Sequence, residues 1–119
     1  MRFYLIGKIG GVKVTPDVKK KFKEFEDKLR AYDIVTEVIN PTSDTVQSAI
    51  ANITRDCKNE QEAYRLILAH DLSLLARCDA VALLPDWLIS NGAYVECVFC
   101  KSAGIPRYYF EGKSLRCFA

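Results

Sequence analysis

Two acidic residues, Asp71 and Glu96, occur where a helix would place apolar side chains. On a helix, the residues three and four positions away surround a side chain. None of these neighbours is charged for either acid; they are Ile67, Leu68, Leu74 and Leu75 around Asp71, and Gly92, Ala93, Phe99 and Cys100 around Glu96. The acids Glu24 and Glu62, by contrast, have lysine or arginine neighbours, which is typical of an exposed helix face.

Burying an ionised carboxylate without a partner is costly, so the two acids need either compensation or a function. The structural alternative is a salt bridge to a lysine or arginine elsewhere in the chain, or a path to solvent at a helix end. The functional alternative is a pair of acids that face one pocket. Burial and mutual repulsion would separate their pKa values, leaving one acid as a charged nucleophile or base and the other as a proton donor. We favour the functional alternative, because perturbed acids gather in active sites.

Other candidate residues lie near Glu96 or at the end of a predicted strand. Ser90 could hold an anion such as a phosphate together with the first-turn amides of its helix, or it could only cap that helix. Gly92 lies one turn before Glu96 and would leave room for a ligand. The loop Gly7-Lys8-Ile9-Gly10-Gly11 could wrap a phosphate or a ribose, although many such loops bind nothing. Trp87 could form the floor of a base-stacking pocket or pack at the surface.

Short apolar runs alternate with segments of helical periodicity. The strands and helices that they predict would position these residues. The runs predict strands over residues 2–6, 34–39, 80–84 and 107–110, with a short edge strand over 115–118. The periodic segments predict helices over about 16–31, 44–57, 60–77 and 91–103. We therefore expect an α/β fold, a three-layer α/β/α sandwich with a parallel, Rossmann- or flavodoxin-like sheet of four to five strands. Ligands bind such sheets beyond the carboxyl ends of the strands.

Composition limits the classes of partner. The 119 residues predict a single domain over 1–119, and a net charge of +2 predicts no nucleic-acid or membrane partner. No apolar run approaches the ~20 residues of a membrane span, and the five cysteines, mostly in apolar segments, are typical of reduced thiols in a cytoplasmic protein. Cys97 and Cys100 form a CxxC pair, but the chain has one histidine and no second pair, so we expect no metal site.

Taken together, these motifs resemble the nucleoside 2-deoxyribosyltransferase-like family, most closely its small phage and bacterial members. The resemblance spans nearly the whole chain. It rests on four segments in order: FYLIGKIGG, VTEVINP, HDLSLLARCDAVALLPDW and SNGAYVECVFCKSAGIP. In this chain Lys8 replaces a small hydroxyl residue, Asp86 replaces a glycine, and the tail after Phe110 lacks the asparagine that transferases lend to a neighbouring subunit.

The resemblance implies cleavage of the N-glycosidic bond of a nucleoside or nucleotide, by hydrolysis or by base transfer. Glu96 would be the nucleophile, Asp71 would manage the proton of the departing base or position the ribose, and Tyr4, otherwise a core residue by position, would orient Glu96. The loop 7–11, with Ser90 and Gly92, would shape the sugar and phosphate site. No cofactor is implied, and a homodimer or larger homo-oligomer is.

Two other functions stay open. In the first, the same pocket binds a nucleotide without turnover, as in a sensor or sequestering protein, with Lys8 and the first-turn amides holding phosphate. In the second, the chain is a structural or interaction domain in which each acid pairs with a lysine or arginine. The sequence also leaves open which base and which phosphate state the pocket would prefer.

Overall fold

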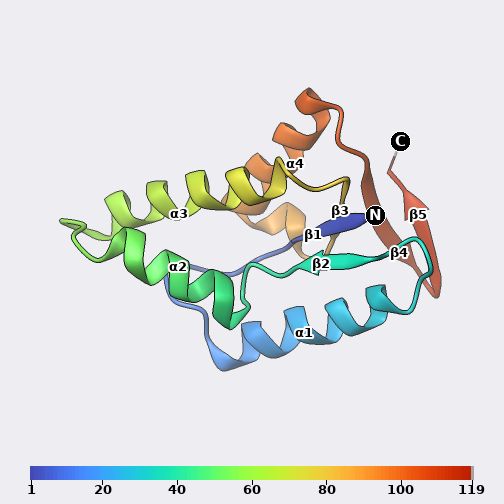
Figure 1. Cartoon of the computed structure of the whole chain (residues 1–119), viewed down its shortest axis with the longest axis horizontal. Coiled ribbons are helices and arrows are strands. Elements are labelled where there is room, and N and C mark those ends of the chain that lie inside the picture. Colours follow the sequence, from blue (N-terminus) through green and yellow to red (C-terminus); the bar gives the residue numbers. More distant parts are fainter. Residues whose placement is uncertain (119) are drawn as a thin grey trace.

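The computed structural model describes residues 1–118, which form one sheet and four α-helices (Figure 1). The strands are β1 (Arg2–Ile6), β2 (Glu37–Ile39), β3 (Ala80–Leu83), β4 (Arg107–Glu111) and β5 (Ser114–Cys117). The helices are α1 (Pro16–Arg30), α2 (Asp44–Thr54), α3 (Glu60–Leu75) and α4 (Asn91–Ala103), and a short 3-10 helix, η1, covers Trp87–Ile89.

The sheet has the strand order β2-β1-β3-β4-β5 and is mixed, so the prediction of a purely parallel sheet is wrong. The first four strands pair in parallel, but β5 runs antiparallel to β4. The reason is local, because only two residues separate the strands and the first of them, Gly112, has a φ of 61°. A glycine with positive φ at this position makes a tight hairpin turn, which returns the chain beside its own strand.

Each face of the sheet carries its own hydrophobic core. Alternate residues of β1 show this clearly, because Phe3 and Leu5 belong to one cluster, whereas Tyr4 and Ile6 belong to the other. The first cluster includes Phe22 and Leu29 of α1. The second includes Leu75 of α3 and Ala93, Cys97 and Cys100 of α4. Accordingly, Figure 1 shows α1 on one side of the sheet and α3 with α4 on the other.

The predicted helices and strands are present, with changes at their ends. Strand β2 is three residues shorter than predicted at its start, because the chain still turns there. The amide of Val35 donates to the Tyr32 carbonyl, and the Thr36 amide donates to the Met1 carbonyl. None of the described helices is long and apolar enough to cross a membrane.

The topology places a crevice between β1 and β3. These strands are neighbours in the sheet, but the chain leaves β1 toward α1 on one face and leaves β3 toward α4 on the other. In open α/β sheets, ligands bind beyond the carboxyl ends of such a strand pair, where the two connections diverge. The loop 7–11 and the segment that leads into α4 lie at this edge.

Candidate functional site

A cavity of about 220 Å³ lies at this edge of the sheet, and both candidate acids line it. Its walls come from the loop after β1, from one face of α3, and from the start of α4. We call it the acid cavity. The lining residues are Gly7, Lys8, Ile9, Gly10, Gly11, Tyr64, Ile67, Leu68, Asp71, Ile89, Ser90, Asn91, Gly92, Ala93 and Glu96.

Asp71 and Glu96 are buried and lack a cationic partner. Only 6% of Asp71 and 7% of Glu96 is exposed, and within residues 1–118 neither forms a salt bridge. Asp71 Oδ1 and Glu96 Oε2 also have no hydrogen-bond partner in the described chain. The alternative in which each acid pairs with a lysine or arginine is therefore wrong for this structure. Because nearly all buried polar atoms in proteins are hydrogen-bonded, these two oxygens point to a ligand or water in the cavity.

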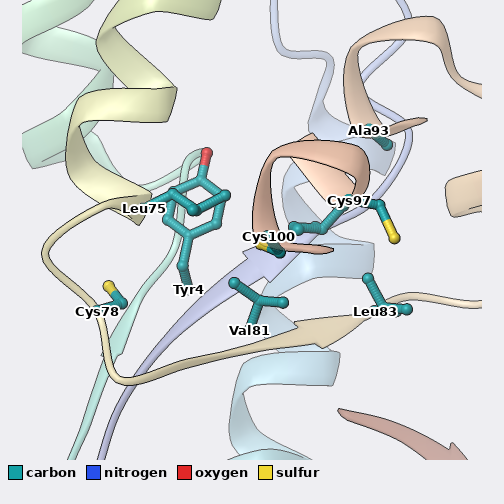
Figure 2. Packing of buried hydrophobic residues seen from close by; sticks show 9 residues of the cluster. Tyr4, Leu75, Cys78, Val81, Leu83, Ala93, Cys97 and Cys100 are labelled. Carbon is teal, nitrogen blue, oxygen red and sulfur yellow. The ribbon is translucent and has the colours of Figure 1, made fainter. Parts of the chain in front are cut away.

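Tyr4 brings a third polar atom to the same place. The residue is fully buried, and its hydroxyl oxygen has no hydrogen-bond partner among residues 1–118. Figure 2 shows its ring rising from β1 beside Leu75, with the hydroxyl directed away from the strand. Burial, followed by the charges of Glu96 and Asp71, raises the pKa of the Tyr4 hydroxyl well above its usual value. Tyr4 is therefore a neutral hydrogen-bond donor held next to the two acids.

Burial also raises the pKa of both acids. The pKa of Asp71 rises from 3.8 to about 7 because the carboxyl is desolvated. The pKa of Glu96 rises from 4.5 to about 8, first through desolvation and then through the negative charge of Asp71. The nearby Tyr4 hydroxyl opposes this rise in the pKa of Glu96, although no hydrogen bond joins the two groups in the described chain.

These shifts differ from the sequence prediction in one respect. We expected the two pKa values to separate, but both rise and they end close together. The two carboxyls therefore titrate as a coupled pair, and the two pKa values describe the pair rather than one residue each. Near neutral pH, states with one charged and one protonated carboxyl are therefore populated, and the single proton of the pair can lie on either acid. Such a state supplies a nucleophile or base and a proton donor in one site.

The glycine loop needs its glycines for two different reasons. Gly10 and Gly11 have φ values of 83° and 135°, which side chains other than glycine rarely adopt. Gly7 is different, because a Cβ there would lie 2.8 Å from the Cβ of Leu84. Gly7 therefore allows the loop to pass close to the end of β3, and Gly10 and Gly11 turn its backbone around the cavity mouth.

A polar clamp fixes the start of this loop. The Lys8 amide donates to Asp86 Oδ1 at 3.1 Å, and Lys21 Nζ donates both to Asp86 Oδ2 and to the Lys8 carbonyl at 2.6 Å each. Asp86, one of the residues that depart from the resembled family, thus ties the loop after β1 to the loop after β3. The Lys8 side chain itself is exposed at the cavity rim.

Ser90 and Gly92 lie at the start of α4, on the cavity wall. The Ser90 hydroxyl accepts a hydrogen bond from the Ala93 amide at 3.3 Å, so Ser90 caps the helix as well as lining the cavity. The space beside Gly92 is not empty, because a Cβ there would lie 2.9 Å from the Tyr64 hydroxyl oxygen. The end of the Tyr64 side chain thus fills part of the room that we expected a ligand to use.

The structure does not bring Trp87 to the acid cavity. Trp87 lines a separate apolar cavity together with Phe118, whose ring it meets edge to face, and it also stacks on Tyr94. The sequence analysis also missed lining residues of the acid cavity, namely Tyr64, Ile67, Leu68, Ile89, Asn91 and Ala93. The sequence could have indicated Tyr64 and Leu68, because their spacing places them on the same helical face as Asp71. Nothing in the sequence singles out Ile89.

Within residues 1–118, no group of three or more histidine, cysteine or acidic side chains is arranged to hold a metal ion. A family model described as "Domain of unknown function (DUF4406)" matches residues 1–109 of the chain. No curated protein and no solved structure matches this chain.

Proposed function

Since the chain belongs to the DUF4406 family, whose description names no activity, we propose its function from the acid cavity: cleavage of the N-glycosidic bond of a nucleoside or nucleotide. One observation carries this proposal. Two buried carboxyls without cationic partners, Asp71 and Glu96, line one cavity at the carboxyl edge of the sheet. The resemblance to nucleoside 2-deoxyribosyltransferase-like proteins supports the same chemistry.

The proposed reaction has two steps. In the first, a Glu96 carboxylate oxygen attacks the anomeric carbon of the sugar, and the electrons of the breaking carbon–nitrogen bond pass to the base. The base then takes a proton from the Asp71 carboxyl, and the sugar stays on Glu96 as an ester. In the second step, water attacks the anomeric carbon, gives its proton to the Asp71 carboxylate, and releases Glu96. This chemistry uses no metal or organic cofactor.

The surroundings of the acids suit an oxocarbenium-like transition state. Because the Glu96 carboxyl is largely shielded from bulk solvent, its negative charge interacts strongly with positive charge that develops on the sugar. The Tyr4 hydroxyl, fixed in the core beside the acids, opposes the rise in the pKa of Glu96 and so favours its ionised form.

The test is base release from a panel of nucleosides and deoxynucleoside monophosphates, followed by chromatography. We expect Glu96→Gln to abolish release and yet melt at or above the wild-type temperature, because the amide keeps the shape of the side chain and cannot become a buried charge. Glu24→Gln, at an exposed acid on α1, is the matched control and should keep wild-type turnover. Wild-type turnover by Glu96→Gln would eliminate the mechanism.

A second function has one observation in its favour. With pKa values of about 7 and about 8, both acids hold a proton for much of the time at neutral pH, and a protonated carboxyl is no nucleophile. The same cavity would then bind a nucleotide without cleaving it, with Lys8 at the rim near the phosphate. Calorimetric binding without any free base after long incubation would favour this function over the first.

Several finer predictions accompany the proposal. We propose a doubly wound, three-layer arrangement, a cytoplasmic location, and assembly as a homodimer or larger, as the resemblance implies. We propose hydrolysis rather than base transfer, because the segment after Phe110 folds back as the hairpin strand β5 along its own sheet. Light scattering of the purified chain tests the assembly, and adding a second free base to the reaction distinguishes transfer from hydrolysis.

A further inference from the structure

A second hollow adjoins the acid cavity, and Tyr64 separates the two. The hollow has a volume of about 420 Å³ and shares Gly11 and Tyr64 with the acid cavity. The Tyr64 side chain reaches from α3 to the start of α4, where its hydroxyl lies beside Gly92. We propose that the base of the substrate occupies this hollow and stacks on Tyr64. This inference rests on the proposed function. The hollow is lined by Gly11, Val12, Glu60, Gln61, Tyr64 and Arg65.

The size of the acid cavity requires such an extension. Ligand pockets usually measure about 300 to 1,000 Å³, so about 220 Å³ is small for a whole nucleoside. The reacting carbon belongs to the sugar and must lie against Glu96 and Asp71. The sugar therefore fills the acid cavity, and the base must continue into a neighbouring space. The hollow beyond Tyr64 shares Gly11 and Tyr64 with the acid cavity and is lined by the same helix.

The arrangement of α3 gives the extension a direction. Gln61, Tyr64, Leu68 and Asp71 are separated by three, four and three residues, so they share one helical face that is about 15 Å long. Asp71, the proposed proton donor for the base, and Tyr64 thus belong to one wall. Glu96 comes from α4, the other wall. A sugar between the helices would be attacked from α4 while its base leaves along α3.

The chemistry of the hollow suits a base better than a phosphate. Tyr64 is 39% exposed, so its ring has a free surface, and Val12 adds an apolar wall. The side chain of Gln61 can donate to and accept from the polar edge of a base. The charges of Glu60 and Arg65 oppose one another, so the hollow has no net attraction for an anion. Aromatic stacking is tolerant of base identity, and the contacts of Gln61 would set the preference.

The test measures binding of free adenine, guanine, cytosine and thymine by calorimetry, separately from base release. Tyr64→Ala should weaken binding of the preferred base about tenfold or more, because the stacking surface is lost. Tyr64→Phe keeps the ring and should stay within about twofold of wild type. Gln61→Ala should reduce the difference between bases. Leu66→Ala is the control, since Leu66 is also 39% exposed on α3 but lines neither hollow.

The outcomes separate this inference from the proposed function. If wild type binds no free base, or if Tyr64→Ala binds as well as Leu66→Ala, the inference is overturned, whatever the enzyme activity. If a base binds through Tyr64 but no substrate releases its base, the inference holds for the site and the N-glycosidase proposal fails. Because Tyr64 is half-exposed, the Ala variant is expected to fold, and Tyr64→Leu offers a second variant without an aromatic ring should Ala melt early.

Discussion

Replacing Asp71 by asparagine should remove the part of the pH dependence of stability that the Asp71 carboxyl causes. The folded chain holds the Asp71 proton up to a pKa of about 7, whereas the unfolded chain releases it near 3.8. The folded state therefore binds more protons than the unfolded state, so stability falls as the pH rises through this window. A shift from 3.8 to about 7 corresponds to about 4 kcal/mol in total, of which about 3 kcal/mol is lost between pH 5 and pH 8.

The measurement is urea unfolding of wild type and Asp71→Asn at both pH values. The free energy of unfolding of the variant, relative to wild type, should rise by about 3 kcal/mol from pH 5 to pH 8. Release of the repulsion on Glu96 adds to this gain, because Asp71 is the second cause of the raised pKa of Glu96. Glu24→Gln, at an exposed acid on α1, should instead follow wild type within about 0.5 kcal/mol at both pH values.

Parallel curves for wild type and Asp71→Asn would refute the reasoning. They would mean that the Asp71 carboxyl is ionised in the folded chain without penalty, and hence that it is hydrated or paired in solution. A variant that is less stable at pH 8 than at pH 5, relative to wild type, would have the wrong sign and would contradict burial of the acid as the cause.

Three further predictions concern the walls of the cavity. Base release should have a bell-shaped pH profile with an optimum between about 7 and about 8, since one acid must be ionised and the other protonated; a flat rate from pH 5 to pH 9 would contradict the pair. Gly7→Ala should lower the free energy of unfolding by about 1 to 3 kcal/mol, because its Cβ meets Leu84 at 2.8 Å, and an unchanged urea midpoint would contradict this. Gly92→Ala should melt within a few degrees of wild type but bind base more weakly, because only the mobile end of Tyr64 must move.

The parts of the fold set by periodic patterns could be predicted from the sequence. Helix α4 was predicted with its correct bounds, because Ser90 caps it and Gly104 ends it in a left-handed conformation with a φ of 75°. The direction of the last strand was missed, because it depends on the conformation of one turn residue, Gly112. The start of β2 was also missed, because apolar composition alone does not distinguish a strand from the turn that precedes it.

The candidate site divides in the same way. Burial of Asp71 and Glu96 could be predicted, because helical spacing shows what surrounds each acid along its own helix. The positions of Tyr64 and Trp87 could not, because they depend on contacts between separate elements. The Tyr64 side chain reaches from α3 to Gly92 at the start of α4, and Trp87 contacts Phe118 near the C-terminal end of the described chain. The spacing of residues in the sequence does not predict either contact.

The two outermost strands of the sheet have a bearing on how copies of the chain meet. Strand β2 spans three residues and strand β5 spans four. An ion pair between Arg2 and Glu37 joins β2 to its neighbour β1, and an ion pair between Glu111 and Arg116 joins β5 to its neighbour β4. Short, charged borders offer little backbone for another chain to extend, which guards against edge-to-edge aggregation. Any specific assembly is therefore expected to form through helical surfaces. The sheets of two molecules would then not pair with each other through backbone hydrogen bonds.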